Sequence, residues 1–251
     1  MPLPGSRVLV VGKSHDLQTT PRHADGCLGA NRGIGLQFVK SYLALNCEVT
    51  GTIRPDSMSD ASADDLKQTG AKILALDFVD EKTIIQAAKD YGDERLDILV
   101  NNGGVHVYPE SWLEHSQQSL MERFQIMAVG PYLTSKHFLP NLLKSDAGKI
   151  VNISSDFGSI GDNDEGECIA YRVAKAGLNQ VTMTIAQELK AKGHKISTMS
   201  VNPGWVPTRM TKGKGNTKIE DSVGGMIKLA DEMTLENTGQ FRKWNGKTLP
   251  F

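Results

Sequence analysis

Short apolar runs alternate with longer helical patterns along this chain of 251 residues. The runs expected to form strands are 7–11, 47–53, 71–77, 96–101, 149–155, 195–201 and, weakly, 239–244. Several are apolar on both faces, which is typical of strands in a parallel sheet that is covered on both sides. The stretches expected to form helices are 34–46, 60–69, 81–91, 116–143, 170–192 and 222–233. This alternation predicts an α/β fold with a doubly wound parallel sheet flanked by helices, where ligands bind beyond the carboxyl ends of the strands.

Composition sets limits on partners and setting. The length suits one domain over residues 1–251, and the net charge of -1 gives no general attraction to nucleic acid or to anionic membranes. No apolar run approaches the ~20 residues of a membrane span. Three cysteines make no disulfide framework, so a reducing, cytoplasmic location is expected. The spacing of His15, His23 and Cys27 matches no common zinc pattern, and no metal site is predicted.

A glycine turn, "GANRGIG" at 29–35, precedes the first expected helix. Glycines allow the backbone to approach a pyrophosphate, and the helix N-terminus behind them favours its negative charge. The turn therefore predicts a Rossmann-like dinucleotide site, although three glycines also occur in ordinary surface turns. The residues expected to contact the cofactor here are Gly12, Gly29, Asn31, Arg32, Gly33, Ile34 and Gly35.

An atypical segment, residues 13–28, separates the first strand from this turn. It is polar, contains turn-forming residues and has no clear hydrophobic period, so we do not expect a packed element. Deleting 13–29 leaves "VLVVGANRGIG", in which the strand runs directly into the turn. Codons for the segment's ends permit splice-donor and splice-acceptor sequences. Two explanations stay open: a retained intron of the short kind common in fungi, or a genuine surface insertion beside the pyrophosphate site.

The ends of the second and third strands carry charged residues. Arg54 stands where an acidic residue would bind a ribose 2′-hydroxyl, and an arginine there suits a 2′-phosphate. Arg32 provides a second cation, so we expect NADP(H) rather than NAD(H), although both arginines could simply face solvent. Asp77 is a candidate partner for the adenine amino group, and Asp80 begins a helix.

Small residues follow two further strands. "NNGG" at 101–104 lets the chain pass close to a flat cofactor, and "NPGWVPT" at 202–208 breaks its strand and offers a hydroxyl to a carboxamide. The polar stretch 209–221 after it has the composition of a mobile lid. The cofactor contacts expected from these strand ends are Asn101, Gly103, Pro203, Gly204, Val206 and Thr208.

The fifth strand ends in Ser154-Ser155, and Tyr171 and Lys175 follow at helical spacing. Residues four apart on a helix share one face. A free phenol has a pKa of ~10, and a neighbouring ammonium would lower it toward the range in which acid–base catalysis works. A serine hydroxyl could then hold a substrate oxygen. Tyr171 and Lys175 are also expected to contact the cofactor.

Together these residues resemble the short-chain dehydrogenase/reductase family. "GANRGIG" is similar to its TGxxxGxG turn, "NNGG" to its NNAG motif, and "NISS…YRVAK" to its Ser–Tyr–Lys set. "NPGWVPTRM" and the stretch 222–251 resemble the C-factor and sniffer-like carbonyl reductases of that family. The resemblance excludes residues 13–28. It implies that Tyr171 is the general acid–base, that Lys175 lowers its pKa and binds the ribose, and that Ser155, the second of the serine pair, orients the carbonyl, with Ser154 as the alternative.

Four departures from the family pattern stand out. Leu28 replaces a threonine before the turn, and Gly103 replaces an alanine. The interval from Ser155 to Tyr171 is long and holds the acidic stretch "GDNDEGE" at 161–167. Met127 takes the place of an asparagine that supports a water-mediated proton relay, and a thioether cannot replace an amide. We therefore expect slowed or altered catalysis rather than none.

The resemblance implies an NADP(H)-dependent oxidoreductase that reduces an aldehyde, ketone or quinone to an alcohol, or catalyses the reverse reaction. Trp112, Phe157 and Trp205 are candidates for an apolar substrate pocket, or simply for the core. Two other functions stay open: a non-redox cyclase or isomerase, and a catalytically silent NADPH-binding regulator. The expected partner is a small molecule, and a homodimer or homotetramer is compatible with the sequence.

Overall fold

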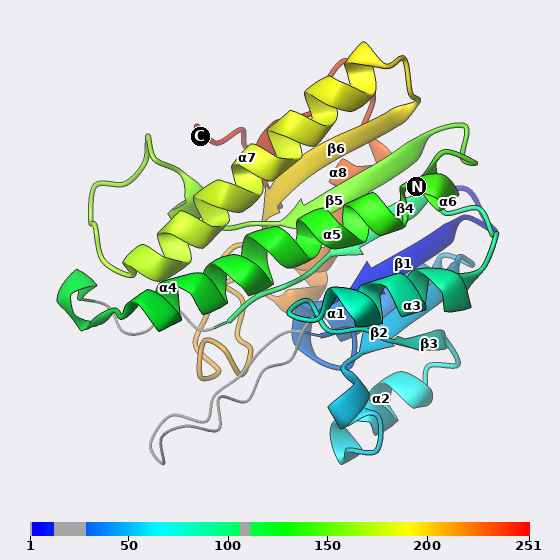
Figure 1. Ribbon diagram of the computed structural model, residues 1–251, viewed down its shortest axis with the longest axis horizontal. Coiled ribbons are helices and arrows are strands. Elements are labelled where there is room, and N and C mark those ends of the chain that lie inside the picture. The colour runs from blue at the N-terminus through cyan, green and yellow to red at the C-terminus, as the bar shows by residue number, and fades with distance from the viewer. Residues whose placement is uncertain (1, 13–28, 106–110) are drawn as a thin grey trace.

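The computed structural model describes residues 2–12, 29–105 and 111–251, so the atypical segment 13–28 lies outside the described part. Seven strands form one parallel sheet in the order β3-β2-β1-β4-β5-β6-β7 (Figure 1). The strands are β1 (Arg7–Val11), β2 (Glu48–Ile53), β3 (Lys72–Ala75), β4 (Ile98–Asn101), β5 (Gly148–Ile153), β6 (Ile196–Asn202) and β7 (Gln240–Lys243). Each of the seven predicted strands is present, and the doubly wound, Rossmann-like sheet is confirmed.

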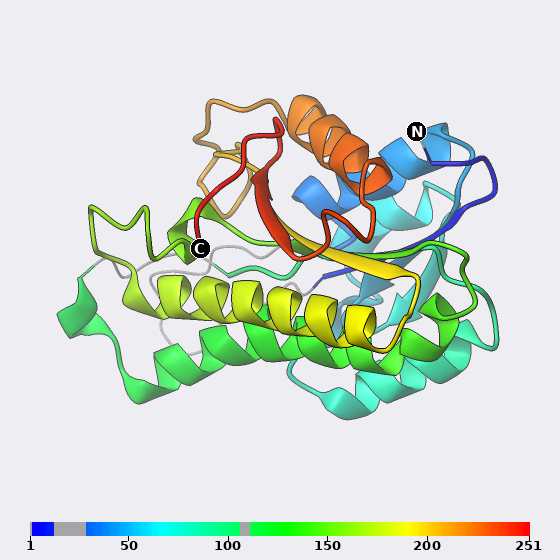
Figure 2. The same cartoon turned by 90° about the horizontal axis from the view of Figure 1, so that it is seen from above.

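Helices cover both faces of the sheet, and Figure 2 shows the three layers edge-on. One face carries α1 (Gly33–Ala44) and α8 (Ile219–Asp231), while α3 (Glu81–Tyr91), α4 (Gln117–Phe124), α5 (Gly130–His137) and α7 (Ile169–Ala191) cover the other. Two shorter helices, α2 (Asp64–Lys67) and α6 (Leu139–Leu142), lie at the sides. The short turns are η1 (Pro55–Ser57), η2 (Ala61–Ala63), η3 (Trp112–Glu114), η4 (Gln125–Val129) and η5 (Asp156–Gly158).

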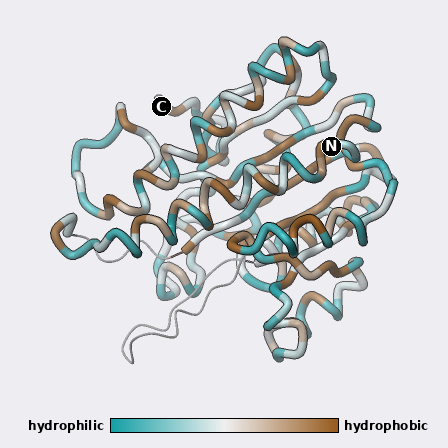
Figure 3. The backbone as a smooth tube through the Cα atoms, in the orientation of Figure 1, coloured by the Kyte–Doolittle hydropathy of each residue, from teal (hydrophilic) through white to brown (hydrophobic). Residues whose placement is uncertain are grey.

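The two layers of helices make two apolar cores on either side of the sheet. Tyr42 and Phe38 anchor the core beneath α1 and α8, whereas Phe78 and Phe138 anchor the core beneath α3, α5 and α7. Figure 3 shows the apolar stretches running along the central strands. Strands that are apolar on both faces need helices packed on both faces, and their continuous apolar sequences therefore predict this layered arrangement.

A buried hydrogen-bond network fixes α7 against the sheet. Asn101 on β4 donates to Asn152 on β5 at 2.8 Å, and Asn152 donates to Thr182 on α7 at 2.8 Å. Ser200 on β6 also donates to Thr182, at 2.8 Å. Buried amides and hydroxyls that satisfy one another specify a unique packing. The network therefore sets the position of the helix that carries Tyr171 and Lys175.

Two of the predicted helices differ from the structure. The single helix expected at 116–143 is interrupted by the π-helical turn η4 and breaks again at Phe138. Prolines explain both places: Pro131 and Pro140 lack the N–H that would continue the ladder of α-helical hydrogen bonds. The helix expected at 60–69 shrinks to α2 with two short 3₁₀ turns before it. α8 begins at Ile219, inside the expected lid.

Candidate active site

Tyr171 and Lys175 lie one turn apart on α7 and face the sheet, and both are buried. The Lys175 Nζ donates to the carbonyl oxygen of Ile153 at 2.7 Å and to that of Gly103 at 3.1 Å. It also lies 5.8 Å from the centre of the Tyr171 ring. Burial lowers the pKa of Lys175 to about 7, because the charged form loses its solvation. The predicted phenol–ammonium pair is therefore brought together where β4 and β5 end.

The two serines at the end of β5 have different surroundings. Ser154 is buried, and its hydroxyl donates to the side-chain oxygen of Asn179 on α7 at 2.7 Å. Ser155 is partly exposed; its Oγ accepts from the amide of Phe157 at 3.2 Å and donates to Asp156 at 3.0 Å. Ser154 is thus used in packing α7 onto the sheet, whereas Ser155 is the more accessible of the two, with its hydroxyl bonded to the neighbouring Asp156 and Phe157.

The glycine turn packs too closely for side chains. Gly33 has a φ of +53°, in the left-handed region that favours glycine. A Cβ on Gly35 would overlap the carbonyl oxygen of Gly29 and approach the Asn102 Nδ2 to 2.9 Å. The carbonyl oxygen of Gly12 lies 3.7 Å from where a Cβ on Gly29 would stand, so the end of β1 and the turn are adjacent in space. The glycine turn therefore lies at the carboxyl end of β1, where a dinucleotide-binding turn is expected.

The first turn of α1 has the composition of an anion site. Its N-cap residue, Arg32, makes no side-chain capping hydrogen bond, and the first turn contains no acidic residue. Free N–H groups and the helix dipole together favour an anion at this position. A phosphate-bearing ligand would satisfy both.

Arg54 follows β2 directly, and its Nη2 donates to the Ser57 hydroxyl at 3.2 Å. Its Nε is buried and, within the described part of the chain, has no hydrogen-bond partner. A buried donor left without a partner costs ~1–3 kcal/mol, so such groups call for an explanation. A bound phosphate would provide the missing acceptor.

Two more buried polar side chains lack partners among the residues that the structure describes. The Thr208 hydroxyl has none, and neither Nδ2 nor Oδ1 of Asn102 has one. Thr208 was predicted to meet a carboxamide, whereas Asn102 was not among the predicted site residues. The signal for Asn102 was present in "NNGG", where the first asparagine was chosen instead.

Two residues predicted to contact the cofactor, Asn101 and Asp77, have side chains that already form hydrogen bonds within the protein. The Asn101 side chain is fully buried, and it bonds Asn152, Thr134 and Ser135 within the protein. Any contact of Asn101 with a ligand would have to come from its backbone. The carboxylate of Asp77 accepts from the amide of Val79 at 3.0 Å, and Asp80 caps α3 as expected.

The remaining residues predicted to contact the cofactor lie after β6 and in the glycine turn. Val206 is buried, while Pro203 and Gly204 are partly exposed, with Gly204 at a φ of +78°. The carbonyl oxygen of Pro203 accepts from the Ser222 hydroxyl at 2.6 Å, which ties this turn to α8. Asn31 and Ile34 are buried within the glycine turn.

Comparison with known proteins decides the family. A model of the short chain dehydrogenases matches residues 27–219. The chain belongs to this family. C-signal of Myxococcus xanthus is 30% identical over 156 residues, which cover 62% of this chain and 93% of that protein. The crystal structure of NADPH-bound carbonyl reductase from chicken fatty liver has a TM-score of 0.86 and 29% identity, covering 99% of this chain and 100% of that one.

Carbonyl reductase Sniffer of D. melanogaster shares the fold, with a TM-score of 0.83 and 24% identity over 99% of this chain and all of that one. The predicted resemblance to the short-chain dehydrogenase/reductases, and to the C-factor and sniffer-like group, is confirmed. Membership makes the chain part of an oxidoreductase family. In the described part, no helix is long and apolar enough to cross a membrane, and no three His, Cys, Asp or Glu side chains group as metal ligands.

Two residues at which the chain departs from the family pattern, Gly103 and Met127, lie in the described part of the chain, whereas Leu28 lies outside it. A Cβ on Gly103 would stand 2.5 Å from the ring of the buried Phe78, so alanine does not fit beside this phenylalanine. Met127 is buried in the same core as Tyr171 and lies in the π-helical turn η4. Pro131, four residues on, has no N–H to give to the Met127 carbonyl, so that oxygen lacks its α-helical donor.

Of the three aromatic residues predicted for a pocket, Trp112 and Phe157 line a cavity beside α7. Trp205 is exposed and takes no part in the lining of that cavity. The Phe157 ring meets the Tyr171 ring edge-on, with 6.1 Å between the ring centres.

Proposed function

We propose that this protein is an NADP(H)-dependent carbonyl reductase that converts an aldehyde, ketone or quinone to an alcohol, or catalyses the reverse reaction. The observation that carries the proposal is the buried pair of Lys175 and Tyr171 on α7, with Nζ 5.8 Å from the ring centre, beside the end of β5 that carries Ser155. Lys175 is held there by the carbonyl oxygens of Ile153 and Gly103, and Ser155 is partly exposed. Such a set favours a working enzyme over the cyclase, isomerase and silent-regulator alternatives.

The described residues fit an NADP(H) molecule. The turn from Gly29 to Gly35 and the N-terminus of α1 would hold the pyrophosphate, and Arg54 with Arg32 would hold the 2′-phosphate. Thr208 and Asn102 offer buried polar atoms that lack partners in the described part of the chain. The chicken carbonyl reductase contains NADPH, which supports this choice of cofactor.

Bound NADPH supplies the hydride. Tyr171 gives the proton to the carbonyl oxygen, and Ser155, by turning its hydroxyl proton from Asp156, donates a hydrogen bond that holds this oxygen. Lys175 in its charged form stabilises the tyrosinate that remains. Its pKa of about 7 leaves the amine only partly protonated in the protein alone. An anionic cofactor nearby would favour the ammonium, and so prepare the pair for catalysis.

We also propose that the chain forms one domain and works in the cytoplasm. The single sheet with a core on each face supports the first point. Cys47 is a buried free thiol, which suits a reducing compartment.

Oxidation of NADPH, followed by absorbance against a panel of aldehydes, ketones and quinones, tests the proposal. The matched pair Ser155→Ala and Ser154→Ala sharpens the test: the first should lower kcat, whereas the second should mainly lower stability through its lost bond to Asn179. Failure of the wild-type chain to oxidise NADPH with any carbonyl, despite binding NADPH, would contradict the proposal.

A further inference from the structure

A cavity of about 470 Å³ opens beside the first turns of α7. Its apolar wall consists of Trp112, Phe157, Ile160, Ile169, Val173 and Ala176. Sites for small molecules usually measure ~300–1,000 Å³ and are mainly apolar. The cavity therefore has the size and character of a ligand site.

The cavity and the catalytic pair lie on different faces of α7. At about 100° per residue, Ile169, Val173 and Ala176 share one side of the helix, and Tyr171 with Lys175 occupies another. Neither Tyr171 nor Lys175 lines the cavity. A molecule in the cavity is thus separated by the helix from the face that carries the proposed chemistry.

Phe157 connects the two faces. Its ring lines the cavity, and the same ring meets Tyr171 edge-on. The guanidinium of Arg172 stacks over the ring at 4.1 Å, and its Nε donates to the carbonyl oxygens of Gly166 and Glu167. A ligand that moves the Phe157 ring would therefore press on Tyr171.

Large apolar side chains of the cavity wall are exposed to water, and the backbone beside them is strained. The side chains of Trp112 and Ile160 are 66% and 76% exposed, although both are large and apolar. Such groups gathered around a hollow mark binding surfaces. The backbone beside them has φ of +59° at Glu167 and +49° at Cys168, which is unfavourable for residues other than glycine.

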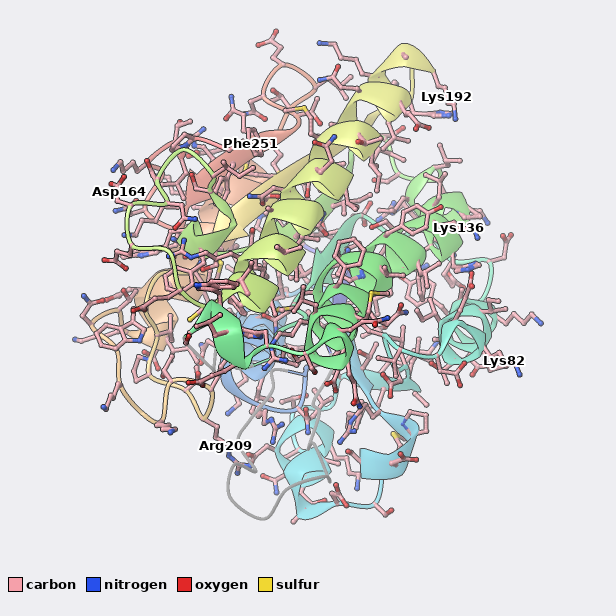
Figure 4. All side chains as sticks on the ribbon, turned by 60° about the vertical axis from the view of Figure 1, so that its left-hand side comes forward. Lys82, Lys136, Asp164, Lys192, Arg209 and Phe251 are labelled. Carbon is pink, nitrogen blue, oxygen red and sulfur yellow. The ribbon has the colours of Figure 1, made fainter. Side chains whose placement is uncertain are left out.

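The rim of the cavity is acidic. Glu167 lines the cavity, and Asp162, Asp164 and Glu165 lie beside it on the same loop; all four are exposed, and Arg172 is the one cation among the described lining residues. Within the described part of the chain none of the four carboxylates has an ion-pair partner. Figure 4 shows Asp164 at the outer edge of this loop. Like charges would repel an anionic ligand. They would also oppose a second copy of this chain, because a twofold interface brings the same patch of both copies together.

We propose that this cavity binds an apolar small molecule without negative charge, about the size of two or three fused or linked rings, and that its occupancy is transmitted to Tyr171 through Phe157. Binding itself does not depend on the proposed function, but the effect on turnover rests on it. The site is distinct from that of the cofactor and from the face that would hold the carbonyl.

A matched pair of dyes tests the binding. N-phenyl-1-naphthylamine is neutral, and 1-anilinonaphthalene-8-sulfonate has the same rings with an added sulfonate. Fluorescence titrations use the full chain with saturating NADPH, which covers the cofactor site. We expect the neutral dye to bind and the sulfonate to bind about tenfold more weakly or worse, because of the acidic rim. Equal affinity for both dyes would overturn the proposal.

Variants locate the dye. Ala176→Phe fills the cavity and should abolish binding of the neutral dye. Ala191→Phe, on an exposed position of the same helix beside Lys192, should bind it like the wild type (Figure 4). If circular dichroism shows that Ala176→Phe does not fold, Val173→Glu introduces a charge at a 46% exposed position and should weaken binding as well. Unchanged binding to the folded cavity variants would place the dye elsewhere and refute the site.

Separate measurements test the acidic rim and the transmission from the cavity to Tyr171. The triple variant Asp162→Asn, Asp164→Asn, Glu165→Gln should tighten binding of the sulfonate and leave that of the neutral dye unchanged.

With carbonyl substrate saturating, the neutral dye should alter kcat; a rise in KM alone would mean that the dye enters the substrate site. A dimer in sedimentation that Ala176→Phe dissociates would identify a second copy as the occupant. If no carbonyl is reduced, the proposed function fails while the dye titrations still decide the site.

Discussion

Tyr171 carries the sharpest prediction at the scale of single residues. Tyr171→Phe removes one hydroxyl and keeps the ring that contacts Phe157 and Lys175. We expect kcat of carbonyl reduction to fall by roughly 10²–10⁴, the usual scale for loss of an acid–base group. The Kd for NADPH should hardly change, which fluorescence titration can check. Full reductase activity in this variant would mean that another group moves the proton.

Lys175 makes stability depend on pH. Its pKa in the fold is about 7, below the unfolded value of ~10.4, so between these pH values the unfolded chain binds more protons than the folded one. The contribution of this lysine to the free energy of unfolding should therefore rise as pH increases from about 7 to about 10. The stabilising contribution is fully present above the unfolded pKa and is lost as pH falls through the folded one.

Comparison with Lys175→Met isolates this effect. Burial also raises the pKa of Cys47 and of Tyr91, the latter to about 12, and these groups act on the stability at high pH in both proteins. Urea unfolding without cofactor at several pH values should show the wild type gaining stability relative to the methionine variant as pH rises. Parallel pH curves for the two proteins would show that Lys175 is charged in the fold.

Arg54 decides the cofactor preference. Arg54→Asp replaces the proposed partner of the 2′-phosphate with a carboxylate that repels it. Loss of a charge-assisted hydrogen bond is worth ~1.5–3 kcal/mol, so NADPH affinity should fall by about tenfold or more while NADH affinity changes less. Calorimetric titration of both cofactors checks this, with Arg95→Asp as an exposed control on another element. Equal losses for both cofactors would remove the basis for NADP(H) preference.

At the scale of elements, the strands and the longest helix, α7, were predictable, whereas the breaks in the stretch 116–143 were not. β1 was located from "RVLVV" alone because a strand covered on both faces has to be apolar throughout. The stretch 116–143 has helical periodicity, yet the breaks depend on what Pro131 and Pro140 do to the hydrogen bonds. The candidate site shows the same limit: "NNGG" predicts a cofactor contact, but only tertiary packing shows that the Asn101 side chain is hydrogen-bonded while that of Asn102 has no hydrogen-bond partner among the described residues.

The π-helical turn η4 suggests how Met127 could replace an asparagine. Pro131 cannot bond the Met127 carbonyl, so we expect this oxygen to accept from a relay water whatever the side chain is. Met127→Asn adds an amide to that position and should raise the rate of the proton-transfer step, at a stability cost of ~1–3 kcal/mol for a buried polar group. The solvent isotope effect on kcat measures the change in the proton-transfer step, and urea unfolding measures the change in stability.

Two further variants bracket this prediction. Met127→Leu should leave the proton-transfer step unchanged, since it keeps an apolar side chain of similar volume. Pro131→Ala restores an N–H that competes for the Met127 carbonyl and should slow the step. If Met127→Asn folds and its rate is unchanged or lower, the site has been rebuilt around methionine.

At the scale of the whole molecule, the described residues on either side of the segment 13–28 are adjacent. The Gly12 carbonyl oxygen lies 3.7 Å from where a Cβ on Gly29 would stand, so removing 13–29 requires little movement of β1 or α1. The resulting chain reads "VLVVGANRGIG", with Gly12 as the first glycine of the turn. We expect this shortened protein to bind NADPH at least as tightly as the full chain and to be at least as stable. Loop length by itself costs little, because closure entropy grows only with the logarithm of length.

Expressing both forms and measuring Tm, NADPH affinity and carbonyl turnover makes the comparison. The gain in affinity would come from the geometry of the phosphate turn, since a displacement of ~1 Å can cost a reaction about a hundredfold. Insertion of a Gly-Ser linker in place of 13–28 controls for length, and it should behave like the full chain if that segment contributes nothing specific. If the shortened form loses NADPH binding or does not fold, while the full chain does both, the segment is a genuine part of the protein and the retained-intron hypothesis is wrong.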